Sequence, residues 1–213
     1  MVLEADSIIY EVDGRKILRG VFLNCRVGEI VGILGRNGSG KSSLFEIIFG
    51  TRKAESSFVR IGDKVLTGKT FRSGMVAFMP QFESLPQHLK VKTILWTASI
   101  PKDAYADDET ILRILDSRVN ELSGGESRYL ELFVVLHSKC PFVLLDEPFN
   151  GISPVVVEDM VKVLKKAATK RGIIISDHNY RAVSRLSDRL MYLNDGRLQE
   201  IGDITELKGL YYY

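Results

Sequence analysis

The chain has 213 residues, of which 45% are hydrophobic, so it is long and apolar enough to bury one sizeable core. Its 29 Lys and Arg residues nearly balance its 27 Asp and Glu residues. The resulting charge of +2, with no block of like charge, argues neither for nor against a nucleic-acid partner. The start of the chain is acidic where a signal peptide would be basic, and no apolar run approaches the ~18 residues that span a bilayer. Any membrane role is therefore expected to act through a partner. Two widely separated cysteines, in no metal-like spacing, are typical of a reduced, cytosolic protein.

The first strands are predicted by alternation of apolar and polar residues. Residues 8–27 alternate around Asp13-Gly14, which is typical of a hairpin with a primed turn. Residues 30–34 form a short apolar run that suits a buried parallel strand. The chain is therefore expected to begin with an antiparallel β unit and to continue into a parallel sheet.

Residues 35–42 read Gly-Arg-Asn-Gly-Ser-Gly-Lys-Ser and fit the G-x-x-x-x-G-K-[ST] pattern of a phosphate-binding loop. The apolar strand before this loop and the helical spacing of residues 43–49 after it give the strand, loop and helix that the pattern requires. Glycines let successive backbone N–H groups point at a phosphate chain, and the helix adds its positive end. Lys41 is expected to neutralise the β- and γ-phosphates and the Ser42 hydroxyl to bind Mg²⁺. The candidate nucleotide-binding residues here are Gly35, Arg36, Asn37, Gly38, Ser39, Gly40, Lys41, Ser42 and Ser43.

The middle of the chain changes from β to helical character. Gly50 ends the first helix, residues 57–61 and 64–66 predict a short strand pair, and residues 75–79 predict a strand closed by Pro80-Gln81. From about residue 82 to 122 the apolar residues recur at helical spacing, which predicts a small helical insertion. A long apolar helix then opens at residue 123 and is expected to end at Pro141.

The last third predicts further alternation of strand and helix. Residues 142–145 and 173–175 are continuous apolar runs typical of central parallel strands. Between them a helix is expected to begin after Ser153, a plausible N-cap, with Pro154 at its first position. Asn194-Asp195-Gly196 predicts the turn of a final hairpin. No repeat or linker divides the chain, so residues 1–213 are expected to form one domain.

Asp146 and Glu147 end an apolar strand about a hundred residues beyond the phosphate loop. Nucleotide hydrolysis needs an acidic residue for the Mg²⁺ shell and a group that orients the attacking water. We assign Asp146 to Mg²⁺ and Glu147 to the water. The alternative is an Asp-Glu-Pro turn that merely leaves the sheet.

The segment Leu122-Ser123-Gly124-Gly125-Glu126 has two interpretations. Ser123 and Glu126 have the spacing of a capping box, which is a purely structural device. Two successive glycines in the first helical turn cost helix stability, however, and they expose N–H groups to which an anion can bind. The segment therefore also predicts a second phosphate-binding helix terminus.

The order of these motifs resembles the nucleotide-binding subunit of the ATP-binding cassette (ABC) family over essentially the whole chain. The resemblance implies an α/β fold: a P-loop NTPase core of the ABC type, with an N-terminal antiparallel β subdomain and a short helical subdomain at about residues 82–136. It also implies a head-to-tail dimer, with an identical or different ABC subunit, in which Ser123, Gly124 and Gly125 act on ATP held by the partner.

The same resemblance assigns roles to three more residues. Tyr10 falls where the family stacks an aromatic ring on adenine, Gln81 where a glutamine links Mg²⁺ and water to the membrane partner, and His178 where a histidine contacts the γ-phosphate. From the residues alone, each has an ordinary alternative: a strand aromatic, a strand-end residue and a surface histidine. The sequence Ser176-Asp177-His178-Asn179 is similar to that of the branched-chain amino-acid and lipopolysaccharide branches of the family.

Several positions depart from the family pattern. The signature segment ends in Glu126 instead of Gln, and Tyr129 and Val134 replace residues that are usually basic. Ser153 stands where an interface Asp is usual, which puts coupling between two ATP sites in question. The stretch between Gln81 and Leu122 is also short, although the docking groove for a membrane partner is formed there.

The expected function is Mg²⁺-dependent hydrolysis of ATP to ADP and phosphate, catalysed by Lys41, Ser42, Gln81, Asp146, Glu147 and His178, with Ser42, Gln81 and Asp146 at the metal. By resemblance this drives a separate transmembrane permease at the cytoplasmic face of the membrane, and no nucleic-acid partner is expected. Two alternatives remain: a soluble, non-transport ABC ATPase, and a regulatory ATP-binding module with little turnover. Soluble ABC ATPases usually carry a long coiled-coil insertion or two cassettes in one chain, and this sequence shows neither. The presence of Glu147 and His178 disfavours a regulatory module with little turnover.

Overall fold

The computed structural model describes residues 1–66, 68–203 and 205, and it contains two sheets. The first sheet is antiparallel with strand order β2-β1-β4-β5; its strands are β1 (Val2–Val12), β2 (Arg15–Arg26), β4 (Ser56–Ile61) and β5 (Lys64–Leu66). Asp13 and Gly14 both have positive φ, 49° and 76°, as the primed turn requires. The predicted hairpin is confirmed, although its first strand begins at Val2 and not at Ile8.

The second sheet carries the parallel strands, in the order β10-β9-β3-β8-β7-β6. Its strands are β3 (Ile30–Leu34), β6 (Val76–Met79), β7 (Phe142–Asp146), β8 (Gly172–Ser176), β9 (Arg189–Asn194) and β10 (Arg197–Ile201). All of these except β10 run parallel to their neighbours. The strands β3, β7 and β8 are buried along their whole length, which explains their uninterrupted apolar sequences.

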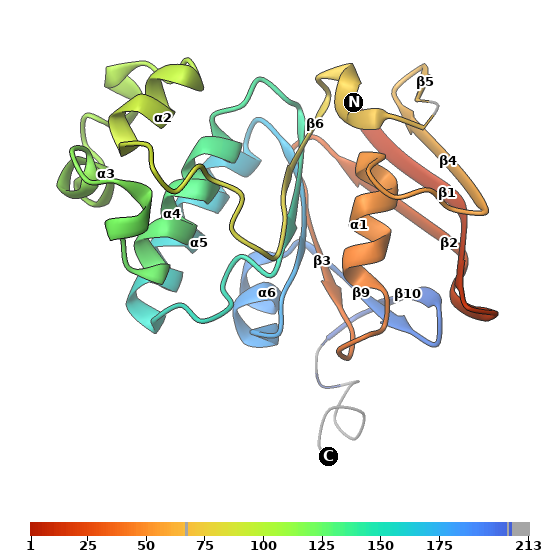
Figure 1. Cartoon of the computed structure of the whole chain (residues 1–213). Helices are drawn as coiled ribbons and strands as arrows, with labels where there is room; N and C mark the ends of the chain where they lie inside the picture. The colour runs from red at the N-terminus through yellow and green to blue at the C-terminus, as the bar shows by residue number, and fades with distance from the viewer. Residues whose placement is uncertain (67, 204, 206–213) are drawn as a thin grey trace.

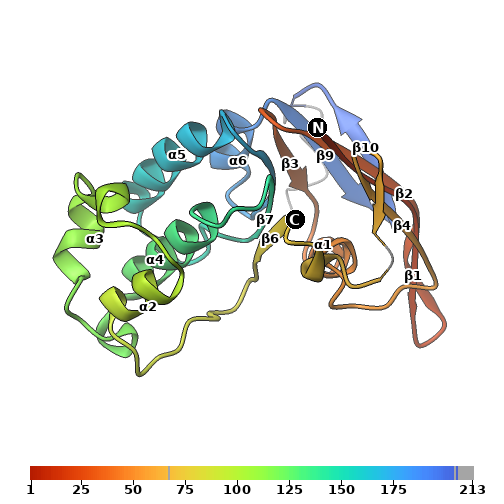
Figure 2. The ribbon, with the colours of Figure 1, turned by 90° about the horizontal axis from the view of Figure 1, so that it is seen from above.

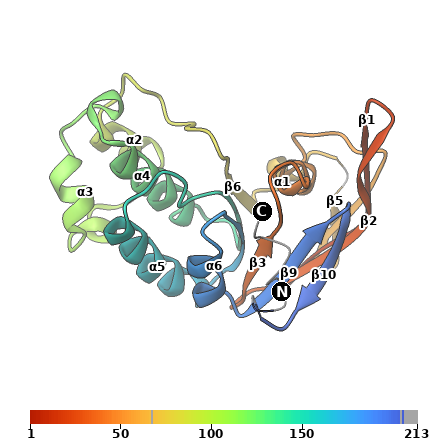
Figure 3. The ribbon, with the colours of Figure 1, turned by 90° about the horizontal axis from the view of Figure 1, so that it is seen from below.

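Helices cover both faces of the parallel sheet. On one face lies α1 (Lys41–Phe49), which packs between β6, β7 and β4 and joins the two sheets in one core (Figure 1). On the other face lie α4, α5 and α6, and α2 and α3 lie beyond α4, away from the sheet, as the views from above and below show (Figures 2 and 3). Their bounds are α2 (Val91–Thr97), α3 (Glu109–Ile114), α4 (Gly124–Leu136), α5 (Pro154–Ala168) and α6 (Tyr180–Leu186). Three 3-10 turns complete the elements: η1 (Thr70–Ser73), η2 (Lys102–Tyr105) and η3 (Val119–Glu121).

The mixed α/β class with its antiparallel and helical parts is confirmed, but three local predictions need correction. The helix α4 ends at Leu136, five residues before Pro141, where the sequence predicted its end, and His137 forms its C-cap. Ser153 occupies the N-cap position of α5, but its side chain makes no capping hydrogen bond. The sequence also gave no sign of α6, a seven-residue helix capped by Asn179. Among the described residues, every helix is too short or too polar to cross a bilayer.

Candidate functional site

The loop between β3 and α1 is open to an anion. Gly38 and Gly40 have φ of 75° and 103°, values that residues with a side chain rarely adopt. Gly40 is also the N-cap of α1, so no side chain of this loop caps the first N–H groups of that helix. The Lys41 ammonium lies inside the loop, where Nζ donates to the carbonyl oxygens of Gly35 (2.8 Å) and Arg36 (3.2 Å). Burial lowers the pKa of Lys41, although the carboxylates of Glu147 and Asp146 oppose this.

Beside this loop lies the Asp146 carboxylate, almost fully buried at the end of β7. Its Oδ1 accepts a hydrogen bond from Ser176 Oγ at 2.8 Å, and the Ser42 hydroxyl also hydrogen-bonds this carboxylate. Burial raises the pKa of Asp146, and the two serine hydroxyls partly offset that rise. Within the part of the chain that the structure describes, no three acidic, His or Cys side chains gather as a protein cage for a metal. A hydroxyl and a carboxylate beside a phosphate loop instead fit Mg²⁺, which takes much of its shell from phosphate and water.

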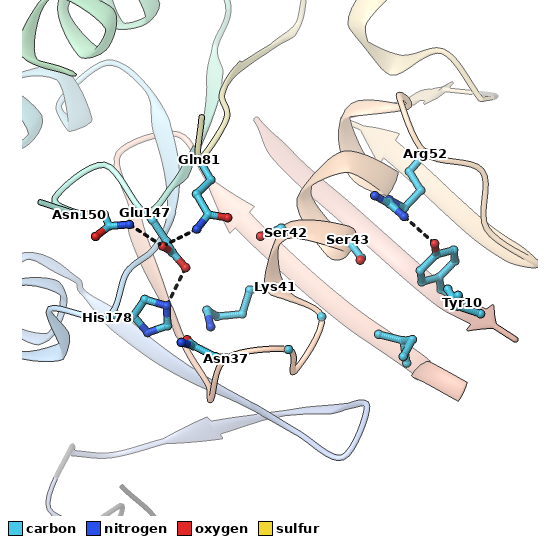
Figure 4. Close-up of a pocket in the computed structure, with 14 residues that line it drawn as sticks. Tyr10, Asn37, Lys41, Ser42, Ser43, Arg52, Gln81, Glu147, Asn150 and His178 are labelled. Carbon is cyan, nitrogen blue, oxygen red and sulfur yellow. Dashed lines mark hydrogen bonds and ion pairs between the residues drawn. The ribbon is translucent and has the colours of Figure 1, made fainter. Parts of the chain in front are cut away.

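The Glu147 carboxylate is held from three directions (Figure 4). Gln81 Nε2 and Asn150 Nδ2 donate to its Oε2 at 2.9 and 3.3 Å, and His178 Nε2 lies 2.7 Å from its Oε1. Its backbone has φ of 49°, unusual for a residue with a side chain, and its N–H donates to Ser176 O at 2.7 Å. The strands β6, β7 and β8 are adjacent and parallel, which brings their carboxyl ends, and hence Gln81, Glu147 and His178, to one edge.

A cavity of about 580 Å³ joins these groups. One end is lined by Lys41, Ser42, Gln81, Glu147, Asn150 and His178. The other end is lined by the aromatic ring of Tyr10 and by Arg52, which follows α1, and Val12 and Ile17 of the same hairpin complete the lining. Ser42 and Ser43 lie between the two ends (Figure 4). The cavity therefore combines an anion-binding half with an aromatic and aliphatic half, as a nucleotide requires.

Sequence reasoning missed Arg128 and Glu131, which form a buried ion pair on α4 with Nη1 to Oε2 at 2.7 Å. Arg128 also donates to the carbonyl oxygens of Pro80, Asp146 and Glu147, at 3.0, 3.3 and 3.1 Å. Glu131 accepts from the N–H and hydroxyl of Ser84. Two charges placed three residues apart in an apolar helix, as here, are the signal that could have identified this pair.

Asn150 and Arg52 were also missed, because neither residue belongs to a recognised motif. Asn150 is identified only by its amide contact with Glu147, and Arg52 by its hydrogen bond to the Tyr10 hydroxyl.

The glycine-rich start of α4 does not line this cavity. Ser123 is the N-cap, and it exchanges hydrogen bonds with Glu126 in a complete capping box. The capping interpretation of the segment is thus realised. If this segment also binds phosphate, the phosphate must belong to a nucleotide held by another subunit, because the segment lies outside the cavity of its own chain.

Comparison with known proteins agrees with this geometry. Residues 18–150 match the model of a protein family described as ABC transporter. The chain is 32% identical to a probable ABC transporter ATP-binding protein of Azorhizobium caulinodans, over 94% of this chain and 77% of that protein. It is 29% identical to LptB, the lipopolysaccharide export system ATP-binding protein of Escherichia coli K12, over 96% of this chain and 92% of that protein. In structure it is similar to an ATP-binding cassette of an ABC transporter (TM-score 0.82, 24% identity, 98% and 94% of the two chains), a likeness of fold.

Proposed function

This chain belongs to the ABC transporter family as an ATP-binding and ATP-hydrolysing subunit, and from that premise we propose how its residues perform the reaction. One observation supports the proposal: the same cavity contains the phosphate loop, where no side chain caps α1, and the buried Glu147 carboxylate, which Gln81 and His178 hold in place. Such a pairing places a water-orienting base next to the bound γ-phosphate.

Each group of the phosphate end has a task in this proposal. Lys41 exchanges the carbonyl oxygens of Gly35 and Arg36 for phosphate oxygens and neutralises their charge. Ser42 and Asp146, with Gln81, would hold Mg²⁺, which when bound neutralises charge on the phosphate oxygens. Glu147 orients the attacking water and accepts its proton, and His178 contacts the γ-phosphate. Gln81 and Asn150 hold the Glu147 carboxylate in place between turnovers.

At the other end the Tyr10 ring stacks on the adenine base. Ring stacking is tolerant of the exact base, so Tyr10 supplies affinity while the phosphate loop supplies orientation.

The proposal also includes the assembly. The whole chain, residues 1–213, acts as one domain that pairs head to tail with a second ABC subunit, so that the Ser123-Gly124-Gly125 segment closes on the partner's nucleotide. A transmembrane permease then holds the pair at the cytoplasmic face of the membrane through the short helical subdomain. This is supported by the relatives, which are named as transporter subunits, and by the absence of the Ser123 segment from the chain's own cavity.

Substitution of Glu147 by Gln tests the proposal. The variant keeps the shape of the side chain but cannot accept a proton, so we expect ATP to bind with near-parental affinity while hydrolysis falls about a thousandfold. ATP should then accumulate in a dimer, measured by size-exclusion chromatography with light scattering. Asp159→Asn, a half-buried residue of α5 outside the cavity, is the control. Hydrolysis by Glu147→Gln at the parental rate would show that Glu147 is not the base.

A further inference from the structure

The nucleobase end of the cavity contains a charged group that the proposed roles leave unused. If the phosphates lie along the loop, the base of the same nucleotide lies toward Tyr10, at the end of the cavity away from Lys41 and Glu147. Among the described residues, Arg52 is the one fully charged side chain lining that end. A guanidinium beside an aromatic ring in a ligand cavity calls for a functional explanation.

We propose that Arg52 is a positioning residue for the nucleobase, one that fixes the Tyr10 ring in the orientation on which the base stacks. This inference rests on the proposed function of the cavity. Arg52 Nη1 donates to the Tyr10 hydroxyl at 2.6 Å, and the guanidinium carbon lies 5.4 Å from the ring centroid (Figure 4). The hydroxyl oxygen lies on the long axis of the ring, so a fixed partner for it restricts the swing of the half-buried ring about χ1, and the guanidinium beside the ring limits its turning about χ2.

The guanidinium can act as such a partner because it is itself anchored to α1. Arg52 Nε donates to the Glu46 carboxylate. The Glu46 carbonyl oxygen accepts from the N–H groups of Gly50, Thr51 and Arg52, at 2.9, 2.9 and 3.2 Å. One side-chain ion pair and one backbone hydrogen bond therefore tie Arg52 itself to Glu46 in the helix, and two further backbone bonds hold the residues just before it. The hydrogen bonds that Arg52 donates to Glu46 and Tyr10 also raise the pKa of Arg52, so it stays charged.

The turn that carries Arg52 is rigid. Gly50 has φ of 88°, and a Cβ at this position would lie 2.1 Å from the carbonyl oxygen of Gly68. Only glycine fits, and the turn is clamped against residues 68–70.

The consequence is that one helix sets both ends of the site. The first residues of α1, Lys41 and Ser42, face the phosphates, and the residue just beyond its end orients the ring for the base. The distance between the phosphate and base subsites is then built into α1, instead of depending on the mobility of a separate loop.

The test compares ATP with inorganic tripolyphosphate, which has the phosphates but no base. We expect Arg52→Met to raise the Kd for ATP about three- to tenfold and to leave the Kd for tripolyphosphate unchanged, both measured with Mg²⁺ by isothermal titration calorimetry. Tyr10→Phe keeps the ring but removes the hydroxyl, so it should raise the ATP Kd similarly, and the double variant should be no weaker than either single one.

Arg60→Met is the matched control. Arg60 pairs with Glu4 across strands β4 and β1, its side chain is 45% exposed against 41% for Arg52, and it lies outside the cavity. An equal loss of tripolyphosphate affinity would overturn the inference, because Arg52 would then act on the phosphates by charge. An unchanged ATP Kd in Arg52→Met would also overturn it. Failure of the unmodified chain to bind ATP or tripolyphosphate would instead contradict the proposed function itself.

Discussion

The chain has two glycine-rich helix starts, and they differ in whether a side chain of the protein caps the first turn. At α1 the N-cap is Gly40, and no side chain caps the first turn. At α4 the N-cap is Ser123, and the Glu126 carboxylate lies at the same end. Its Oε2 accepts hydrogen bonds from the N–H and the hydroxyl of Ser123, at 2.9 and 2.7 Å. The start of α1 can therefore bind an external anion, whereas the start of α4 is already occupied by the carboxylate of Glu126.

The difference explains why only α1 belongs to a preformed site. Ser123 lowers the pKa of Glu126 through these hydrogen bonds, and Arg113 adds to the effect, so the carboxylate is ionised at neutral pH. A phosphate approaching α4 must compete with this charge. On the proposed function, the start of α4 binds only a nucleotide that is already fixed by another subunit.

Removing the Lys41 ammonium from the α1 end should have the largest effect. On the proposed function, Lys41→Ala removes the ammonium that neutralises the β- and γ-phosphates, so we expect the Kd for ATP to rise about a thousandfold, or ~4 kcal/mol. Equilibrium dialysis with labelled ATP would measure this. Lys64→Ala, an exposed lysine on β5, is the control. Unchanged ATP affinity in Lys41→Ala would contradict the phosphate-loop interpretation.

The buried pair Arg128–Glu131 links α4 to the backbone at the carboxylate end of the cavity, and its side chains are 7% and 2% exposed. Arg128→Met should lower the free energy of unfolding by about 3 kcal/mol, because Glu131 is left buried without its cation. Urea unfolding would measure that loss. The loss of stability in Arg128→Met does not by itself show that the pair affects the catalytic end of the cavity.

The double variant Arg128→Met/Glu131→Leu separates the two roles. Replacing both charges with apolar side chains should restore most of the stability. The carbonyl groups of Pro80, Asp146 and Glu147 would still lack their shared donor, so we expect kcat to stay about tenfold low. A double variant that hydrolyses ATP at the parental rate would show that the pair serves stability only.

The parts of the fold that follow from local chemistry were predictable. Continuous apolar runs identified β3, β7 and β8, and the Asp-Gly turns at residues 13–14 and 195–196 both have the positive φ values that their sequences favour. The capping box of Ser123 and Glu126 also follows from three-residue spacing. The helix α6 could not be predicted, because seven residues with three buried side chains show too little periodicity.

The site was predictable where motifs end parallel strands, since adjacent strands bring Gln81, Glu147 and His178 together. The roles of these residues stay predictions. The contacts of Arg52 with Tyr10 and of Arg128 with the Pro80 carbonyl oxygen were beyond sequence reasoning for a physical reason: they are set by packing and not by spacing. Asn150 lies only three residues from Glu147, but no sequence pattern marks its amide as a partner of that carboxylate. The bond from Arg52 to Tyr10 joins residues 42 apart in sequence, and that from Arg128 to Pro80 residues 48 apart.

Neutralising Glu126 should make the start of α4 resemble that of α1, with the smallest effect of these changes. Glutamine can still complete a capping box, so Glu126→Gln should unfold near the parental temperature. Without the carboxylate, the helix end attracts an anion more strongly, and we expect ATP-driven dimerisation in the Glu147→Gln background to tighten about threefold. Analytical ultracentrifugation would measure the dimer constant. Glu121→Gln is a close control, because Glu121 accepts from Arg118 N–H at 2.8 Å in the same way on η3. An equal shift in both variants would indicate a general charge effect, and then the self-capped end of α4 would not be the feature that delays closure on the partner's nucleotide.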